Sequence, residues 1–466
     1  MNESGSTLAI IGGGLAGMAA AVDAVGQGLR VELFERAKTL GGRAGSFVDG
    51  ETGDRIDYCQ HVAMGCCTEF LDFCRRTGID DCFERTDTLH LIGPESDRND
   101  LAPTRWLPVP LHLLPGLMRL AYLSWGERWR IVRAMRKLVR ENDTTMENSR
   151  RLTASGGSDD ESTETIGAWL RRQGQSPRAI ERFWSVVLVG ALGETVDRAS
   201  LSAARKVFCD GFLASRGAGD LVPPRVPLGE IFHDRLSPWL TDKGVKIHLE
   251  TPVRRVEGDQ RRARTVVLAD GTRKAFDRVV VAVPWRGART LFDEHLSAAM
   301  PALEKIEQIE PAAITAVHLW FDRPVVPLPH AVLVGRLSQW VFAKPRGNGG
   351  QYCQIVISAS HRLAERTHDA LLAEVDCELG VVWPKVRKAR QLHRRVVVQP
   401  AAVFSVQPGL DRLRPPQQTP IENLALAGDW TSTGWPATME SAVRSGRQAV
   451  RALLGPAARG CQQTMP

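Results

Sequence analysis

Residues 7–17 read TLAIIGGGLAG, a short apolar run followed by glycines with the spacing GxGxxG. The alanine-rich residues 15–27 overlap the end of this stretch and predict a helix. Residues 30–34 predict a second strand, which ends at Glu35, 18 residues after the last glycine. This order is typical of the βαβ unit that binds a dinucleotide, with the acidic residue placed to accept hydrogen bonds from a ribose diol.

Each glycine of the motif has its own role in binding a pyrophosphate. Gly12 allows a tight turn, Gly14 allows the backbone to approach the phosphates, and Gly17 allows the helix to pack closely on the strand. The phosphates then meet the positive end of the helix dipole and the first N–H groups of the helix. We place Leu15 and Ala16 at that helix start.

A second glycine loop, Leu40-Gly41-Gly42-Arg43, follows the second strand. It can bring another backbone segment against the same pyrophosphate, with Arg43 as the counter-charge. The loop resembles the GGR motif of the amine-oxidase and phytoene-desaturase superfamily of flavoproteins. This resemblance implies that the dinucleotide is FAD, and we include Arg36 in the cofactor set. No Cys or His lies in an obvious attachment motif, so we expect non-covalent binding.

The C-terminal end resembles the second half of the flavin site in the same superfamily. Residues 424–427 predict a buried strand that ends in Gly428-Asp429, and residues 437–454 predict a last helix. The resemblance implies that Asp429 binds the ribityl or phosphate part of FAD and that the backbone of Val253 contacts the adenine. It also places the start of the last helix under the flavin ring, where the residues are Ala437, Thr438 and Met439.

The chain has 466 residues, which predicts two or three domains. The predicted fold is α/β: a Rossmann-like FAD-binding domain, discontinuous in the sequence, and a second α+β domain for the substrate, as in amine oxidases and phytoene desaturases. The FAD-binding domain is assigned to residues 1–66, 228–300 and 415–456. The substrate-binding domain is assigned to residues 67–227 and 301–414.

Hydrophobic patterning assigns secondary structure within these domains. Residues 67–240 predict mainly helices and residues 243–283 short strands. Further strands are predicted at 312–320, 331–334 and 352–357, and a helix at 369–382. Residues 143–165 are polar and rich in Ser, Thr, Asp and Glu, so we expect a mobile surface loop there, and residues 457–466 are expected to form a disordered tail.

Several longer stretches resemble hydroxysqualene dehydroxylases, FAD-dependent enzymes of bacterial squalene and hopanoid synthesis. They are Asp57-x-x-Gln60-His61-Val62-x-Met64-Gly65, residues 107–115, Phe183-Trp184 and residues 210–228. This sequence departs from the family pattern at Tyr58 and Cys59, where the family usually has Asn-Gly. The resemblance implies that reduced FAD gives a hydride to an allylic cation, so that hydroxysqualene becomes squalene. Such a reaction needs an acid, an apolar tunnel and a dry flavin face.

Asp57, Gln60 and His61 are the candidate catalytic residues, because the resemblance places this segment beside the flavin. We expect His61 or Asp57 to activate or orient the leaving hydroxyl, since histidine is a natural proton donor near neutral pH. Alternatively, His61 only holds a loop through hydrogen bonds to the backbone or the flavin. Asp210 and Arg216 are expected to pair with each other; alternatively, they shape the substrate cavity.

Four aromatic residues are candidates for the substrate tunnel, where they would stabilise cation character. Core packing is an equally good account of each. They are Phe183, Trp184, Phe208 and Phe212.

Residues 106–140 mix Leu, Pro, Met and Trp with arginines and predict an interfacial element that rests on anionic lipid. The alternative is an amphipathic helix with a solvated basic face. The formal net charge of +7 is modest, and no nucleic-acid-binding motif accompanies it. The nine cysteines include no CxxC pair, so neither a disulfide framework nor a metal site is predicted. No signal peptide or bilayer-spanning run is found, which predicts a cytoplasmic protein that can rest on the inner face of the cytoplasmic membrane.

Two other kinds of function share these motifs. A carotenoid or isoprenoid desaturase, or an amine oxidase, would use the same FAD site in the oxidising direction. A non-catalytic prenyl-lipid carrier could keep the fold while losing the flavin, although Glu35, Arg43 and Asp429 are all present. An NAD-dependent dehydrogenase would not need the C-terminal half of the flavin site.

Overall fold

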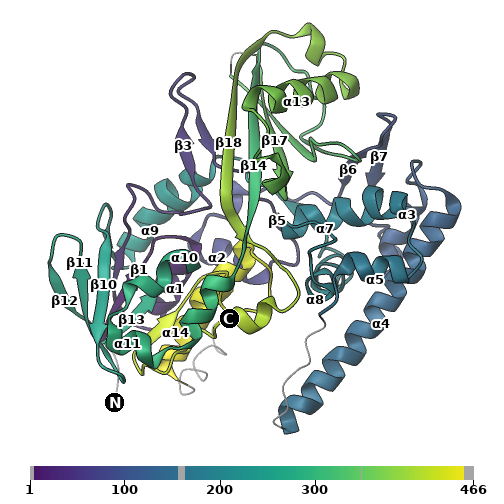
Figure 1. Cartoon of the computed structure of the whole chain (residues 1–466). Coiled ribbons are helices and arrows are strands. Elements are labelled where there is room, and N and C mark those ends of the chain that lie inside the picture. The colour runs from purple at the N-terminus through teal and green to yellow at the C-terminus, as the bar shows by residue number, and fades with distance from the viewer. Residues whose placement is uncertain (1–4, 156–162, 348, 456–466) are drawn as a thin grey trace.

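The computed structural model describes residues 5–155, 163–347 and 349–455 and contains a five-stranded parallel sheet (Figure 1). The strand order is β19–β13–β1–β2–β9. The strands come from the start, the middle and the end of the chain: Thr7–Ile11 (β1), Arg30–Phe34 (β2), Lys246–His248 (β9), Arg278–Val281 (β13) and Leu424–Leu426 (β19). The predicted Rossmann-like α/β fold with a discontinuous nucleotide-binding part is confirmed.

Both faces of this sheet are covered, which explains why β1 is continuously apolar. Leu8 and Ile10 share a core with helices α1 (Leu15–Gly26) and α14 (Met439–Leu454). Ala9 and Ile11 share another core with an antiparallel three-stranded sheet. The strands of that sheet are Val253–Gly258 (β10), Ala263–Leu268 (β11) and Arg273–Ala275 (β12). The parallel sheet is therefore the middle of three layers.

Helix α2 (Thr68–Thr77) packs in the α1 and α14 layer. Its residues Phe70 and Phe73 belong to the same core as Leu8. Arg447 of α14 forms ion pairs with two carboxylates of α2, those of Glu69 and Asp72. Helix α2 follows the domain boundary predicted at residue 67, but its apolar face is buried in the core of the nucleotide-binding part.

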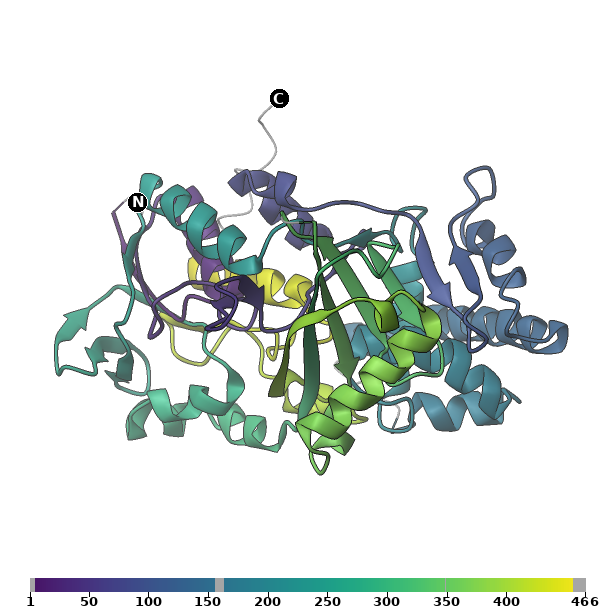
Figure 2. The ribbon, with the colours of Figure 1, turned by 90° about the horizontal axis from the view of Figure 1, so that it is seen from above.

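A seven-stranded sheet forms the centre of the second part of the molecule, in the order β18–β14–β17–β16–β15–β6–β7. The strands are Gln391–Phe404 (β18), Pro311–Phe321 (β14), Gln351–Ser358 (β17), Trp340–Pro345 (β16), His330–Leu333 (β15), Leu89–Ile92 (β6) and Arg98–Leu101 (β7). Helix α13 (His368–Val382) lies along one face and packs there through Leu372, Val375 and Leu379 (Figure 2). The hairpin of β3 (Ser46–Val48) and β4 (Arg55–Asp57) stands beside this sheet (Figure 1).

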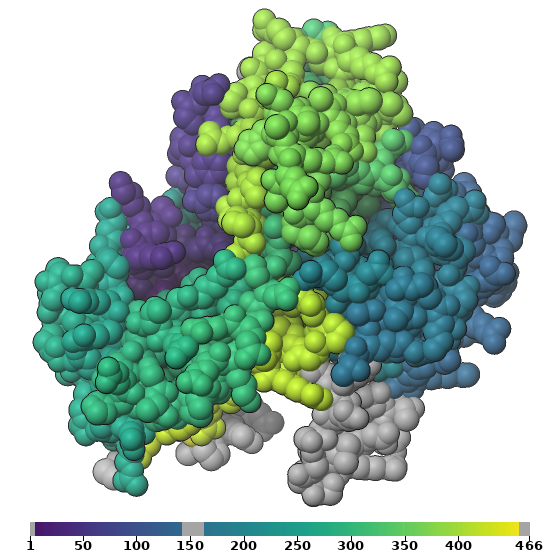
Figure 3. Space-filling model, viewed as in Figure 1, coloured from purple at the N-terminus to yellow at the C-terminus, as the bar shows by residue number. Residues whose placement is uncertain are grey.

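A group of helices packs beside the seven-stranded sheet: α3 (Leu114–Met118), α4 (Trp125–Ser155), α5 (Ile166–Arg172), α7 (Ser185–Leu192) and α8 (Leu201–Arg205). In Figure 3 the yellow C-terminal segment lies between this blue group and the green middle of the chain. Strands β6 and β7 precede the helices, in a region for which mainly helices were predicted.

Helix α4 continues to Ser155, so the loop predicted from residue 143 is wrong over residues 143–155. A polar composition limits burial, but it does not stop the extension of a helix that has already nucleated, because each further residue adds a hydrogen bond. Residues 156–162 of the predicted loop and the predicted tail at 457–466 lie outside the described residues.

Helix α1 meets α14 at a point where only a glycine fits. A Cβ atom on Gly446 would lie 2.2 Å from the carbonyl oxygen of Ala16 and 2.8 Å from the amide nitrogen of Ala20. The backbones of two helices from opposite ends of the chain therefore approach more closely than a larger residue at 446 would allow.

We predict that Gly446→Ala lowers the melting temperature, because its methyl group would overlap the backbone of α1. Overpacked sites typically cost about 1–3 kcal/mol, which circular dichroism during heating should detect. Gly126→Ala in α4 is the matched control, since nothing lies within 4 Å of its Cβ position and alanine favours helix. Equal melting temperatures for the two variants would contradict the close packing.

Candidate functional site

The glycine loop at the carboxyl end of β1 is too closely packed for side chains. Gly12 has φ +110°, and a Cβ atom there would lie 2.5 Å from the carbonyl oxygen of Ala282. A Cβ atom on Gly17 would lie 1.9 Å from the carbonyl oxygen of Gly12. These two glycines let β1, α1 and the end of β13 meet.

Helix α1 begins without a side-chain cap. Its N-cap residue is Gly14, and its first turn carries no acidic residue. By contrast, the hydroxyl groups of Thr367 and Thr438 cap α13 and α14. No atom lies within 4 Å of the Cβ position of Gly14. The start of α1, at Leu15 and Ala16, therefore offers backbone N–H groups and a positive dipole end to an anion.

Glu35 lies beside this loop at the end of β2. Its Oε2 accepts a hydrogen bond from the amide of Gly13 (2.6 Å), and its Oε1 accepts one from the amide of Ala37 (2.8 Å). The amide of Thr251 donates to the carbonyl oxygen of Glu35 (2.9 Å), which brings the segment that leads to Val253 to the same edge of the sheet. The predicted ribose and adenine contacts therefore lie close together.

The second glycine loop crosses the first. The amide of Gly41 donates to the carbonyl oxygen of Gly13 (2.9 Å). Gly42 has φ +59°, and a Cβ atom on it would lie 3.3 Å from Gly14 Cα. Arg36, which precedes this loop, is exposed. The crossing places two backbone segments where one diphosphate could contact both.

Arg43 and Asp429 form an ion pair that joins the two ends of the chain. Arg43 Nη2 lies 2.5 Å from Asp429 Oδ1, and the Asp429 side chain is 5% exposed. Arg43 also donates to the carbonyl oxygen of Ala402 in β18 (3.1 Å) and lies over the ring of Trp285. The second glycine loop, the C-terminal segment and the seven-stranded sheet therefore converge at one guanidinium group.

Arg414 is a site residue that the sequence analysis missed. Its buried guanidinium donates to the carbonyl oxygens of Asp429 (2.9 Å), Thr431 (2.6 Å) and Trp435 (2.9 Å). It thereby fixes the chain that runs from Gly428 to the start of α14. No local motif distinguishes Arg414 from the other basic residues, so only the fold reveals its role.

The start of α14 is held by its own cap and by a link to α2. Thr438 Oγ1 accepts from the amide of Ser441 (3.1 Å). Glu440 is fully buried and accepts from the amide of Phe70 in α2 (2.8 Å). Ala437 and Met439, which flank the cap residue, are therefore fixed in position at the start of α14.

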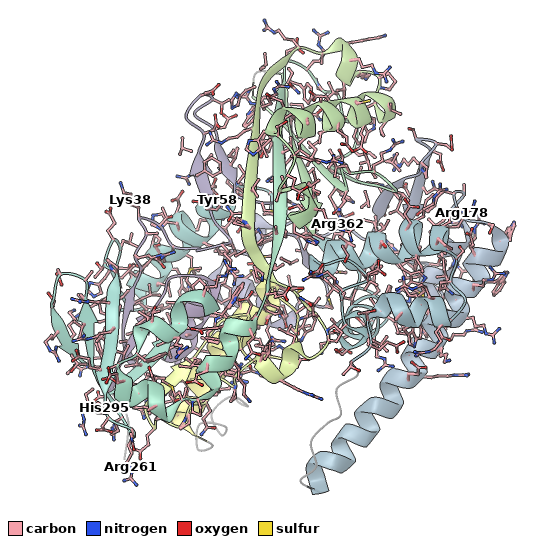
Figure 4. The ribbon with its side chains drawn as sticks, viewed as in Figure 1. Lys38, Tyr58, Arg178, Arg261, His295 and Arg362 are labelled. Atoms are coloured by element: carbon pink, nitrogen blue, oxygen red, sulfur yellow. The ribbon has the colours of Figure 1, made fainter. Side chains whose placement is uncertain are left out.

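A pocket of about 530 Å³ lies beside the β3–β4 hairpin, at the seven-stranded sheet. The amide of Tyr58 donates to the carbonyl oxygen of Gly45 (3.2 Å), which links the pocket wall to the second glycine loop. Figure 4 shows Tyr58 where the hairpin meets the sheet. The lining includes Asp57, Gln60, Lys344, Tyr352 and Gln354.

The Asp57 carboxyl is buried and held by one of its two oxygens. Oδ1 accepts from the Ser46 hydroxyl (2.6 Å) and from the amide of Leu228 (2.8 Å). Burial raises the pKa of Asp57 to about 6, although these hydrogen bonds and the charge of Lys344 act in the opposite direction. The group can therefore hold and release a proton close to neutral pH.

His61 is less suited to supply a proton. Its Nδ1 lies 2.9 Å from the carbonyl oxygen of Cys59, so the ring donates to the backbone there. Burial lowers the pKa of His61 below its usual range, and the positive charge of Arg43 lowers it further. The hydrogen bond favours the hypothesis that His61 holds its own loop, by bonding to the backbone at Cys59. The effect of Arg43 also shows that His61 lies near that guanidinium.

The sheet face that borders the pocket changes from polar to apolar along its strands. Lys344 pairs with Tyr352, Phe342 with Gln354, and Trp340 with Val356 in the register of β16 and β17. Phe342 and Val356 also pack against Cys59, two residues after Asp57. The polar lining around Asp57 is therefore followed along the strands by apolar residues that pack with Cys59.

The comparison with known families identifies the scaffold. Residues 15–454 match the model of the family described as flavin containing amine oxidoreductase. The chain belongs to this family. FAD is the cofactor of these oxidoreductases, and the residues present fit it: the uncapped start of α1 and the crossed glycine loops suit its diphosphate, Glu35 suits its ribose, and Arg43 provides a counter-charge.

Relatives of this flavin-dependent oxidoreductase catalyse different reactions at similar sequence identity. A hydroxysqualene dehydroxylase of Sinorhizobium fredii is 26% identical over 94% of this chain and 96% of its own. A zeta-carotene desaturase of Synechocystis sp. is 24% identical over 97% of this chain and 98% of its own. The solved structure of cyclohexylamine oxidase from Brevibacterium oxydans has a TM-score of 0.67 and 19% identity, and it covers 96% of this chain and 98% of its own. Family and fold are shared among them, but the reaction is not.

The four predicted substrate aromatics form a chain of ring contacts in the helical part of this flavoprotein. Trp184 contacts Phe183 and Phe208, and Phe208 contacts Phe212. Trp184 is fully buried and donates to Gln175 Oε1 (2.9 Å), as expected of a core residue. None of the four lines the Asp57 pocket.

The expected pair of Asp210 and Arg216 is wrong, because Asp210 pairs instead with Lys206, one helical turn before it. Among the described residues, no cluster of His, Cys, Asp and Glu has the size needed for a metal ion. The described helices also include none with the length and apolar character to cross a bilayer.

We predict that Arg43→Gln weakens FAD binding about 10-fold or more, because it leaves the buried Asp429 carboxylate unpaired and removes the counter-charge. Fluorescence titration of the flavin-free protein with FAD measures the effect. Arg264→Gln is the matched control: it breaks an exposed arginine–aspartate pair of similar length (2.6 Å) with Asp259. Unchanged affinity in Arg43→Gln would show that this pair does not support the cofactor.

Proposed function

We propose that this protein reductively removes the hydroxyl group of hydroxysqualene and forms squalene. The observation that carries the proposal is the Asp57 carboxyl, a buried acid with a pKa of about 6 that lines a pocket at the seven-stranded sheet. The segment from Asp57 to Gly65 also resembles hydroxysqualene dehydroxylases, and one such enzyme is among the relatives.

The cofactor and Asp57 have different roles in the proposed reaction. FAD, when bound in its reduced form, supplies the hydride. Asp57 gives a proton to the hydroxyl oxygen, so that the C–O bond breaks and water leaves from an allylic carbon. One proton and one hydride thus replace the hydroxyl group by hydrogen, and the reaction is balanced.

The other pocket residues orient the substrate. The Gln60 and Gln354 amides in the lining can hydrogen-bond the hydroxyl group. Trp340 lies beyond the lining, further along β16, and its partly exposed ring offers apolar surface to the isoprenoid chain. The aromatic chain from Phe183 to Phe212 remains our prediction for a more distant part of the tunnel.

Product analysis tests the proposal directly. FAD-loaded protein, chemically reduced without oxygen, should convert hydroxysqualene to squalene, detected by mass spectrometry. A zeta-carotene desaturase among the relatives supports a second candidate, an isoprenoid desaturase. Oxidation of squalene, phytoene or zeta-carotene by the oxidised protein, without dehydroxylation, would favour that candidate. Tight lipid binding with neither reaction would favour the lipid carrier.

We predict that Asp57→Asn lowers the turnover of hydroxysqualene about 10²–10⁴-fold, the usual contribution of a proton donor. An asparagine oxygen can still accept from Ser46 and Leu228, so the variant should fold and retain FAD. The wild-type rate should fall as pH rises through about 6, because only the protonated carboxyl can donate. His61→Ala is the companion variant and should have a smaller effect.

Lys344→Met separates a proton-donating role of Asp57 from a structural one. The positive charge of Lys344 lowers the pKa of Asp57, so its removal should move the falling limb of the pH profile to higher pH. A structural role of Asp57 predicts no such shift. If the falling limb of the pH profile stays in place in Lys344→Met, or moves to lower pH, Asp57 is not the proton donor.

A further inference from the structure

One face of helix α4 carries tryptophans followed by cations. Trp125, Trp129, Arg133, Arg136 and Arg140 follow one another at intervals of three or four residues, which places them on one side of an α-helix. Trp125 is 64% exposed and Trp129 is 56% exposed, unusual values for so large an aromatic side chain. We call these five residues the α4 stripe.

The opposite face of α4 holds the helix on the molecule. Ile131 and Leu138 are fully buried there. Glu127 forms an ion pair with Arg178, and Figure 4 shows Arg178 at the outer side of the helical group. Packing of the helix therefore does not need the stripe, and the exposed tryptophans call for another explanation.

A groove of about 930 Å³ runs along the stripe and has an excess of positive charge. Its cations include Arg133, Arg136 and Lys137 of α4 and Arg205 of α8. Glu141 is the acidic residue in its lining, and it already contacts Arg205 (2.9 Å) and Lys137 (3.9 Å). Arg133 and Arg136 therefore leave net positive charge for an external anion.

We propose that the α4 stripe docks this protein on the surface of a bilayer that contains anionic phospholipid. Tryptophan favours the interface between headgroups and acyl chains, where its ring is buried and its N–H stays polar. Arginines on the same face then meet the lipid phosphates. A nucleic acid would also attract the arginines, but the two exposed tryptophans at one end of the row favour a lipid surface. This docking is independent of the reaction proposed above.

Co-sedimentation of the FAD-loaded protein with vesicles tests the proposal. The protein should bind vesicles of phosphatidylcholine and phosphatidylglycerol, bind pure phosphatidylcholine at least ~10-fold more weakly, and lose most binding to the anionic vesicles at high salt. Arg133→Glu with Arg136→Glu should lower the partition coefficient at least ~10-fold. Trp125→Ser with Trp129→Ser should also lower it, and should reduce the binding that remains at high salt.

Lys385→Glu with Lys388→Glu provides the matched control, because it makes the same change in net charge at two exposed residues that follow α13. Figure 1 shows α13 far from α4. The control should bind like the wild type. An equal loss in the control, or equal binding to both vesicle types, would overturn the proposal. Displacement from the vesicles by a short DNA duplex, with no effect of the tryptophan change, would instead assign the stripe to nucleic acid. Flavin absorbance shows throughout that each variant is folded.

Discussion

The ion pair of Arg43 with Asp429 is the contact on which the cofactor site depends. It connects a loop near the start of the chain to a turn near its end, and the same guanidinium reaches the carbonyl oxygen of Ala402 in the seven-stranded sheet. A carboxylate as buried as that of Asp429 is stable only when it is paired. The pair therefore fixes how the two parts of the molecule meet, and Arg414 stabilises it further by holding the backbone of Asp429.

The nucleotide-binding part could be predicted from sequence because its constraints are local. Gly17 meets the carbonyl oxygen of Gly12 within one βαβ unit, and Gly12 itself has a positive φ that belongs to the same turn, so both positions disfavour residues with a side chain. Its strands are covered on both faces, so they appear as uninterrupted apolar runs. Even the distant C-terminal strand could be recognised, because it is buried in the same way and ends in Gly428-Asp429.

The seven-stranded sheet was harder to predict, because its strands do not all have the pattern of buried strands. Strand β18 lies at the edge of that sheet and reads QLHRRVVVQPAAVF, a mixture of charged and apolar residues without the pattern of a buried strand. Lys344 and Arg414 have no motif around them, and they become site residues only when distant segments come together. Helix α4 shows the same limit, since the polar composition of residues 143–155 carries no information on whether a helix nucleated earlier continues through them.

The environment of a titratable group, rather than its type, determines what it can do in this pocket. A histidine is the usual choice for proton transfer near neutral pH, yet burial and the nearby Arg43 favour the neutral form of His61 and leave its Nδ1 bound to the backbone. An aspartate is usually ionised at that pH, yet burial brings the pKa of Asp57 to about 6. A dehydroxylase must deliver a proton to oxygen, whereas a desaturase must take hydrogen from carbon. A buried carboxyl with a pKa of about 6 fits the first of these requirements. Relatives named for the two reactions have similar identity to this chain, so overall similarity does not separate the two reactions.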